Sequence, residues 1–324
     1  MARGNRTGLG EWTAFGGILT VSVLSLATSH WGEAIHWELL SHFKAQYFGL
    51  ALLVMVGLAL GQHTCLAVAS IACVAFAFLP LLAFYFPNDS LARSPDESNF
   101  SLLSANVHQN SSDPAQLASA IAQADPDAVV LQEASPSWLE RLSAIRNAFP
   151  FDYHRAGTIL LSKTPIDEGQ LKPLDSARGF VLPKFFTTEG KAVALVAAHL
   201  LPPISQRNFR ARNEAYSRIE EAINRLSGSV VLVGDLNTTM WSPYYQKLVD
   251  GTGLINTRKG FGIFPTWPTA NNPLGLPGFA ARLLSIPIDH CLVTSELQVV
   301  QTRALSSVGS DHRPIAVDLV VPRR

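Results

Sequence analysis

Residues 230–237 read VVLVGDLN: an unbroken apolar run that stops at a glycine, a carboxylate and an amide. A short apolar run without alternation, bounded by turn residues, is typical of a strand that is covered on both of its faces. Because helical stretches alternate with such runs, the sequence predicts an α/β fold of two packed β-sheets with helices outside. Further strands are predicted at residues 100–105, 128–131, 158–162, 192–198, 288–293 and 315–320.

Several helix starts are marked by a capping residue followed by proline, which loses nothing at the first helical position because its missing N–H would be unpaired there. This signature occurs at Asp113–Pro114, Ser135–Pro136 and Ser242–Pro243. A further helix is predicted from about residue 206 to 226, where apolar side chains recur on one face and mostly Arg and Glu on the other.

Polar side chains that could bind a metal or move a proton lie at the ends of several predicted strands. Together they offer oxygen ligands for a hard divalent cation, a base for water and donors for the charge on phosphoryl oxygens. The sequence therefore predicts a metal-dependent phosphoesterase site at one edge of a sheet. The residues concerned are Asn106, Glu133, His199, Asp235, Asn237, Asp311 and His312.

Taken singly, most of these residues also have an ordinary structural explanation. Asp235 and Asn237 fit an Asx turn that leaves a strand, and equally a carboxylate beside a metal or nucleophile with an amide that donates to phosphate. Glu133 fits an acid at the start of a helix, and also a buried carboxylate that a metal compensates. His199 alone fits a core histidine, and Asn106 alone fits a turn residue.

The motif SDHRP at residues 310–314 is more specific, because an adjacent acid and imidazole before proline have few structural reasons to occur together. An imidazole that acts as a base needs its second nitrogen oriented by a carboxylate. Asp289, in the motif IPIDH, is the candidate partner for His312. The adjacent His290 is expected to point to the other face of its strand.

In combination these motifs resemble the endonuclease/exonuclease/phosphatase superfamily, and the resemblance covers nearly all of residues 98–322. It implies a four-layer α/β sandwich and a site for Mg²⁺ or Mn²⁺, in which Glu133 would be the principal metal carboxylate, with Asn106 and Asp311 beside it. The motifs that carry the resemblance are Asn106, QE at 132–133, His199, GDLN at 234–237, IDH at 288–290 and SDHRP at 310–314.

The resemblance also implies how the remaining site residues act. Asp235 and Asn237 would hold the attacking water and the phosphoryl oxygens. His312, oriented by Asp289, would be the base or the proton-bridging partner. His199 would donate to the phosphoryl oxygens.

The first 90 residues carry three apolar stretches, at about 14–28, 47–61 and 65–86. A helix that crosses a bilayer needs roughly 20 apolar residues, which the third stretch supplies and the first two reach with their flanks. We therefore expect about three transmembrane helices in residues 1–87, a polar linker at 88–98 and the catalytic domain at 99–322. A cleaved signal peptide is the alternative for the first stretch.

The orientation in the membrane is predicted from charge. Arg3 and Arg6 precede the first apolar stretch, and positive residues favour the cytoplasmic side. With the N-terminus inside, three spans would place the catalytic domain outside the cytoplasm. The turn at residues 62–64 carries no Lys or Arg, so it adds nothing to this prediction.

The charge of the catalytic region bears on its substrate. From residue 91 onward there are 22 Lys and Arg against 21 Asp and Glu, a net charge of +1. A domain that grips long nucleic acid usually has a basic surplus, so nucleic acid is not the favoured partner. Segments at 125–142, 234–243, 260–268 and 286–297 also resemble a bacterial branch of membrane hydrolases associated with glycopeptide resistance, which implies a place in the bacterial plasma membrane and a lipid-linked phosphate as substrate.

We therefore expect a membrane-anchored, metal-dependent hydrolase of phosphoester or phosphoanhydride bonds, with the lipid bilayer and a phosphorylated, lipid-linked substrate as its partners. Two alternatives stay open: a nuclease with the same machinery, and a catalytically inactive membrane scaffold that binds phosphorylated ligands. The near-neutral charge opposes the first, and the intact set of motifs opposes the second.

The stretch from Ile255 to Ile288 is too long for a simple connection, and loops of this length are usually functional or disordered. One interpretation is that it folds over a small core of its own. The other is that residues 274–284 rest on the bilayer surface and guide a lipid-linked phosphate into the site, with Arg282 favouring anionic headgroups. The apolar residues of this segment are Leu274, Leu276, Phe279, Leu283 and Leu284.

Overall fold

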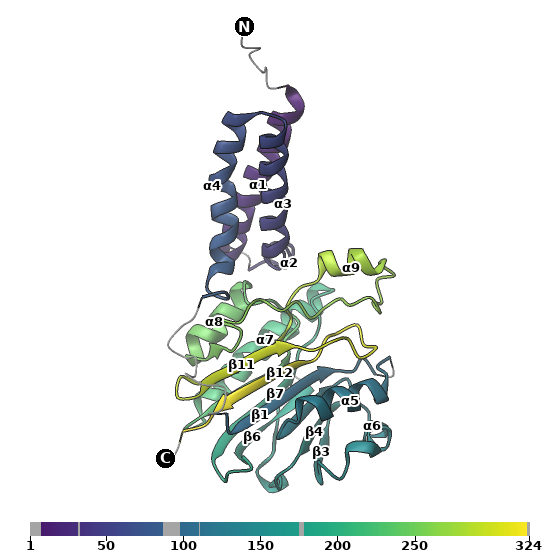
Figure 1. Cartoon of the computed structure of the whole chain (residues 1–324). Coiled ribbons are helices and arrows are strands. Elements are labelled where there is room, and N and C mark those ends of the chain that lie inside the picture. Colours follow the sequence, from purple (N-terminus) through teal and green to yellow (C-terminus); the bar gives the residue numbers. More distant parts are fainter. Residues whose placement is uncertain (1–7, 32, 87–97, 110, 175–177, 323–324) are drawn as a thin grey trace.

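The computed structural model describes residues 8–31, 33–86, 98–109, 111–174 and 178–322. A slender bundle of helices stands at one side of a larger α/β domain (Figure 1). The predicted linker at 88–98 lies, except for Ser98, outside the described residues, and so do Arg3 and Arg6.

The helices of the bundle form from the apolar stretches of the N-terminal region. They are α1 (Leu9–Trp31), α2 (Ile35–Ser41), α3 (Lys44–Leu60) and α4 (Thr64–Leu82). By length and composition, α1 and α4 could each cross a membrane, whereas α3 could do so only together with the short α2, from which it is bent by 61°. The described residues thus contain two candidate spans, or three if the bent pair is one span, which is compatible with a membrane protein.

The chain runs along the bundle three times. α1 runs towards the α/β domain, α2 lies at the base of the bundle, α3 returns and α4 runs towards the domain again (Figure 1). The N-terminal end of α1 therefore lies at the end of the bundle remote from the domain. Large apolar side chains on the outside of the bundle, such as Leu53, Val68 and Ile71, are exposed, and many exposed apolar side chains on one bundle suit lipid better than water.

The α/β domain contains two six-stranded sheets, each with one parallel pair near its centre. The first sheet has the order β11-β12-β1-β2-β4-β3, with β1 (Phe100–Asn106), β2 (Ala128–Gln132), β3 (Phe151–Arg155), β4 (Thr158–Ser162), β11 (Gln298–Ala304) and β12 (Ile315–Val320). The second has the order β5-β6-β7-β8-β10-β9, with β5 (Lys172–Pro173), β6 (Arg178–Phe186), β7 (Ala192–His199), β8 (Val230–Asp235), β9 (Ile255–Asn256) and β10 (Asp289–Val293).

Helices cover the outer faces of both sheets. The remaining helices are α5 (Pro114–Ala124), α6 (Ser137–Arg141), α7 (Gln206–Asn224), α8 (Pro243–Thr252) and α9 (Gly278–Leu284), with short 3-10 turns at Ser143–Ile145 and Glu168–Gln170. Leu117 of α5 and Trp138 of α6 pack on the first sheet, while Ile219 of α7 and Leu248 of α8 pack on the second.

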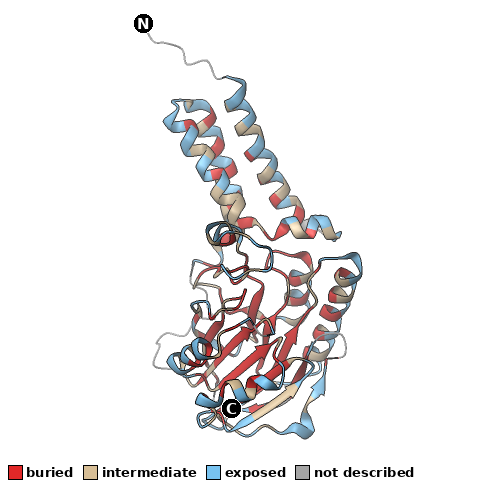
Figure 2. Cartoon of the chain, turned by 90° about the vertical axis from the view of Figure 1, so that its right-hand side faces the viewer, coloured by how far each residue is buried: buried red, intermediate tan, exposed pale blue. Residues whose placement is uncertain are grey.

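A third apolar core lies between the two sheets. It includes Leu102 and Val130 from the first sheet and Val231 and Val233 from the second, all nearly inaccessible to water. Figure 2 shows that buried residues are concentrated in the sheets and on the inner faces of the helices. The molecule therefore has helix, sheet, sheet and helix layers, and the predicted four-layer α/β sandwich is confirmed.

Five strands were not expected from the sequence: β3, β5, β6, β9 and β11. β3 and β11 lie at the edges of the first sheet, and their polar, partly exposed sequences FDYHR and QVVQTRA lack the unbroken apolar run of a buried strand. β6 contains a proline at residue 183, and its pairing with β7 shifts register between Leu182 and Phe185. A proline is tolerated within a sheet at such an irregularity, but it removes the sequence signal of a regular strand.

Two of the three predicted helix starts are confirmed. The side chain of Asp113 accepts from the N–H groups of Ala115 and Gln116, and that of Ser242 accepts from the N–H of Tyr244. The third prediction was wrong by one position, because α6 begins at Ser137 and its cap position is occupied by the proline. Ser135 is no cap there, since its hydroxyl lies 2.7 Å from the hydroxyl of Ser137.

Candidate active site

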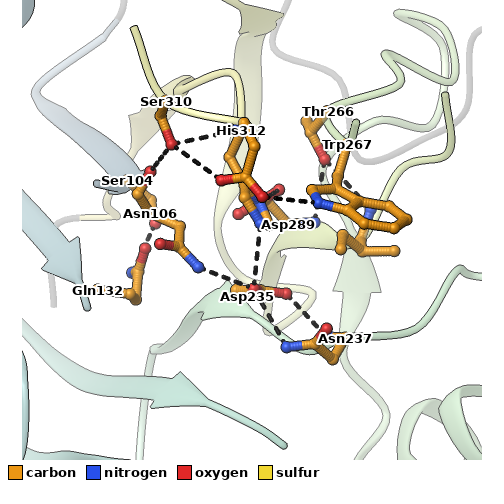
Figure 3. Close-up of polar contacts among 12 residues, drawn as sticks. Ser104, Asn106, Gln132, Asp235, Asn237, Thr266, Trp267, Asp289, Ser310 and His312 are labelled. Atoms are coloured by element: carbon orange, nitrogen blue, oxygen red, sulfur yellow. Dashed lines mark hydrogen bonds and ion pairs between the residues drawn. The ribbon is translucent and has the colours of Figure 1, made fainter. Parts of the chain in front are cut away.

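The arrangement of strands brings the polar strand ends to one edge of the sandwich. β1 and β2 run parallel and end at Asn106 and just before Glu133, and in the second sheet β7 and β8 run parallel and end at His199 and Asp235. β10 is antiparallel to β8 and begins at Asp289, directly opposite Asp235. Side chains far apart in the sequence therefore meet at this edge (Figure 3).

Asp235 lies at the centre of the site and is almost fully buried. Asn106 donates from Nδ2 to the carboxylates of Asp235 at 3.0 Å and of Glu133 at 3.2 Å. The N–H of Asn237 donates to Asp235 at 2.8 Å, and its side-chain amide lies 3.2 Å from the other carboxylate oxygen. Asn237 adopts a positive φ of 49°, which turns the chain back towards the carboxylate. Three N–H donors from two asparagines thus fix the orientation of Asp235.

His312 and Asp289 form the pair that was expected from their motifs. His312 Nδ1 lies 2.9 Å from Asp289 Oδ2, and His312 Nε2 lies 3.8 Å from Asp235 Oδ2. Thr266 adds to the pair, because its hydroxyl accepts from the N–H of Asp289 at 3.3 Å. His290, by contrast, faces the opposite side, where its Nε2 lies 2.8 Å from the carbonyl oxygen of Thr238.

Burial and charge shift the proton affinities of this group. Burial acts to lower the pKa of His312, but the carboxylates of Asp289 and Asp235 outweigh it and raise that pKa to about 10. Burial together with the negative charge of Asp289 raises the pKa of Asp235 to about 7, against the lowering effects of His312 and the amide hydrogen bonds. The pKa of Asp289 is lowered, because the adjacent imidazolium outweighs the effect of burial. The protonation of each of the three side chains therefore depends on the charge of the other two.

Glu133 and His199 also lie close to Asp235. His199 Nε2 is 3.6 Å from Glu133 Oε1 and 3.9 Å from Asp235 Oδ2. Burial lowers the pKa of His199 to about 4, so the ring is neutral near pH 7. Its buried Nδ1 has no hydrogen-bond partner among the described residues. The side chain of Glu133 is 21% exposed, and its backbone has a positive φ of 54°, which fits a residue held in position by its surroundings.

Asp311 is held by side chains that sequence reasoning did not single out as site residues. Trp267 Nε1 donates to its Oδ2 at 3.0 Å, and His108 Nδ1 lies 2.9 Å from its Oδ1. Ser310 donates to the carbonyl oxygen of Asn106 at 2.7 Å, which fastens this loop to the end of β1. The signals were present but weak, since His108 follows Asn106 by two residues and Trp267 lies in the motif GFGIFPTWP.

These groups line a cleft of about 560 Å³. Its lining includes six of the predicted site residues, namely Glu133, His199, Asp235, Asn237, Asp311 and His312. Asn106 and Asp289 lie behind them and contact the lining residues. Arg178, which the sequence did not suggest, also borders the cleft, and apolar walls come from Leu39, residues 201–204 and Leu274.

The donor set fits a hard divalent cation, and the geometry bears on where it would be held. Asp235, Asp289 and His312 have ligand atoms within 4.8 Å of one another. Because Asp289 and His312 already satisfy each other by a direct hydrogen bond, we assign this cluster to proton handling. Glu133 carries an accessible carboxylate, and Asp235 and Asp311 present further oxygens to the same cleft. In this arrangement Asn106 donates to the carboxylates and positions them.

Comparisons with known proteins agree with the architecture. A sequence model described as the endonuclease/exonuclease/phosphatase family matches residues 103–312. No curated protein matches this chain.

Among solved structures, an endonuclease/exonuclease/phosphatase from Beutenbergia cavernae DSM 12333 is 19% identical, with 69% of this chain and 72% of that chain covered and a TM-score of 0.55. A family protein from Bacteroides thetaiotaomicron is 17% identical, with coverage of 69% and 98% and a TM-score of 0.52. D. rerio TDP2, complexed with a single-strand DNA product, is 15% identical, with coverage of 68% and 98% and a TM-score of 0.53. At these identities the likeness shows the fold alone.

Proposed function

The chain belongs to the endonuclease/exonuclease/phosphatase family, and from this premise we propose that it is a membrane-anchored hydrolase that uses a divalent metal to cleave a phosphoester or phosphoanhydride bond of a lipid-linked substrate. Hydrolysis of phosphoester bonds is the chemistry of the family. The observation that carries the rest of the proposal is the shape of the cleft. Its buried lining residues are polar, such as Asp235 and His312, whereas the exposed side chains that line it include the apolar Ile204 and Leu274.

The buried polar side chains of the cleft suit the attack of water on phosphorus. Asp235 is placed to accept a proton from that water, because two asparagine amides hold its carboxylate beside His312. His312, fixed by Asp289 and protonated near pH 7, can donate a proton to the leaving group. His199 faces the same cleft, where its ring can donate to a phosphoryl oxygen as negative charge develops.

Glu133 would hold Mg²⁺ or Mn²⁺, with Asp311 and Asp235 presenting oxygens from the other walls of the cleft. When bound, such a cation neutralises charge on the phosphoryl oxygens. The indole N–H of Trp267 and the amide of Asn106 keep the carboxylates in place.

Exposed apolar side chains at and near the cleft support the proposal that the substrate is amphiphilic. Ile204 is 82% exposed, and α9 exposes Phe279 and Leu283 while it buries Ala281. The large side chains of α9 therefore do not form a core of their own, which favours the interpretation that this segment rests on a bilayer. α9 lies beside α2 at the base of the bundle (Figure 1). Gln46, near the start of α3, ties the two regions together, because its amide donates to the carbonyl oxygens of Leu283 and Ser285 at 3.0 Å each.

The bundle supports the anchoring part of the proposal. Three passes through a bilayer would put the N-terminal end of α1 and the catalytic cleft on opposite sides of it, as the two ends of the bundle are arranged (Figure 1). With Arg3 and Arg6 on the cytoplasmic side, the cleft would open at the outer surface of the bacterial plasma membrane. A phosphate group attached to a lipid of that leaflet would lie at the level of α2 and α9.

The proposal is tested with the full-length protein in phospholipid vesicles. Phosphate release is measured from undecaprenyl pyrophosphate in the bilayer and from nucleotides, and alcohol release is measured from a soluble phosphodiester. Cleavage of plasmid DNA is measured in parallel. We expect metal-dependent hydrolysis of the lipid pyrophosphate to exceed that of the soluble substrates. Glu133→Gln, which keeps the side-chain volume and removes the charge, serves as the inactive control.

Each alternative predicts a different result in the same experiment. Faster cleavage of plasmid DNA than of the lipid substrate would favour the nuclease. Binding of phosphorylated lipid without turnover of any substrate would favour the scaffold. Hydrolysis confined to soluble nucleotides would refute the lipid-linked substrate while leaving the phosphoesterase chemistry in place.

A further inference from the structure

A buried ion pair joins the membrane region to the segment that follows Asp235. Glu38 of α2 has no exposed surface, and its Oε1 lies 3.2 Å from Nη1 of Arg212 in α7, which is also fully buried. Thr238 donates its hydroxyl to the same Glu38 oxygen at 2.9 Å. Arg212 in turn donates to the carbonyl oxygen of Asn237 at 3.2 Å. One carboxylate from α2 therefore fixes two successive residues next to the floor of the cleft.

α2 makes a second contact with the same segment. His42, just after the end of α2, has its Nδ1 3.0 Å from Oγ1 of Thr239 and its Nε2 3.5 Å from Glu38. Leu39 and His42 both line the catalytic cleft. Residues of the membrane region thus contact residues 237–239 directly or through Arg212, and they also form part of the wall of the cleft.

Other contacts between the bundle and the domain involve different residues. Tyr244 donates its hydroxyl to the carbonyl oxygen of Glu33 at 2.7 Å, and Lys247 pairs with the side chain of Glu33. The indole N–H of Trp241 donates to the carbonyl oxygen of Pro80 at 3.0 Å. These contacts attach the domain to the bundle, and they offer a control for any effect of attachment alone.

We propose that Glu38 is a positioning residue for hydrolysis, which acts through Arg212 and Thr238 on the orientation of Asp235. The link is short, because the N–H of Asn237 donates directly to the Asp235 carboxylate at 2.8 Å. A displacement of about 1 Å in such a group can lower the rate by about 10²-fold. The membrane region is then a component of the catalytic site as well as an anchor. This inference rests on the proposed hydrolysis for its kinetic test.

Two variants of the full-length protein separate positioning from folding. Glu38→Gln removes the charge that pairs with Arg212 but keeps an oxygen that can accept from Thr238. Thr238→Val removes the hydroxyl and leaves the ion pair in place, so no buried charge loses its partner. The matched control is Glu33→Gln, which breaks the exposed pair with Lys247 in the same interface.

The kinetic readout is the hydrolysis of a soluble phosphodiester, which needs no contact with the bilayer. We expect kcat to fall by about 10-fold or more in both Glu38→Gln and Thr238→Val, since the reacting groups are misplaced, while KM stays within about twofold. Glu33→Gln should keep the wild-type kcat. If Glu38→Gln and Thr238→Val keep a kcat within about twofold of wild type, the proposal is overturned.

Amide hydrogen exchange in residues 236–240 gives a readout that does not depend on activity. We expect faster exchange of this segment in Glu38→Gln than in Glu33→Gln, because only the former loses a contact with it. Equal exchange in the two variants would contradict positioning by Glu38. A wild-type protein that hydrolyses no phosphoester would refute the proposed function instead, and the exchange experiment would then decide on positioning by itself.

Discussion

Replacing Phe279 and Leu283 with serine tests whether α9, which follows Leu274 of the cleft wall, rests on a bilayer. These side chains are 71% and 69% exposed. Full burial of a Phe or Leu side chain contributes about 1.5–3 kcal/mol. Scaled by the exposed share of each side chain, contact with lipid would contribute about 1–2 kcal/mol per residue and about 2–4 kcal/mol for the pair. The structure directs the test to this pair, since Leu276 is half-buried and its N–H donates to Asn272.

The candidate spans would keep the double variant in the membrane, so the loss should appear in the delivery of substrate. Since 1.4 kcal/mol corresponds to a factor of ten, a loss of about 2–4 kcal/mol should lower kcat/KM for a lipid pyrophosphate in vesicles by about 30- to 700-fold. Turnover of a soluble phosphodiester should stay within about twofold of wild type, because this substrate reaches the cleft from water.

The assay compares phosphate release from the lipid pyrophosphate with alcohol release from the soluble phosphodiester, at matched protein density in the vesicles. Phe186→Ser is the control, since Phe186 is 42% exposed and lies at the opposite end of β6 from the cleft. Equal losses on both substrates would mean that α9 packs on the catalytic domain. Unchanged hydrolysis of the lipid substrate would mean that the two side chains do not contact the bilayer.

Three further predictions follow from the site and the bundle. Activity should vanish in excess EDTA and return with Mg²⁺ or Mn²⁺, because the donors are carboxylates; full turnover with metal content confirmed as zero would contradict this. Asp235→Ala and His312→Ala should each lower kcat by about 10²–10⁴-fold with little change in the unfolding temperature. Asp289→Asn should lower kcat less, because it misorients His312 without removing it. A variant that keeps a near-wild-type kcat would show that the substituted residue takes no part in the mechanism. A reporter fused after Arg324 should be active only in a form that works outside the cytoplasm, and a cytoplasmic signal would mean that one span was miscounted.

The strands that the sequence predicted are those whose own residues form an unbroken apolar run. β2 and β8 were predicted because their apolar runs are buried on both faces. β3 and β11 were missed because an edge strand exposes one side to water and can have a polar sequence. Stabilisation of these strands comes from pairing with a neighbour, which the strand's own residues do not reveal.

The same distinction applies to the site. Asp289 and His312 were matched from their motifs, and the structure brings them to 2.9 Å from each other. Nothing near Glu38 in the sequence points to Arg212, because the two residues are 174 positions apart and meet only when the bundle and the domain pack together. A buried ion pair of this kind depends on tertiary packing, which residue patterns and spacing along the chain do not encode.

The position of β12 has a consequence for the order in which the protein becomes active. β12 lies between β11 and β1, and pairs Phe100 with Leu319, so an early segment of the domain is completed by a late one. Asp311 and His312 arrive on the loop that enters this strand. A nascent chain that has formed its N-terminal helices and β1 to β10 therefore has Asp289 but still lacks Asp311 and His312. On the proposed mechanism, catalysis would begin only after the ribosome has released these residues, so a chain that stops before residue 311 would lack hydrolytic activity.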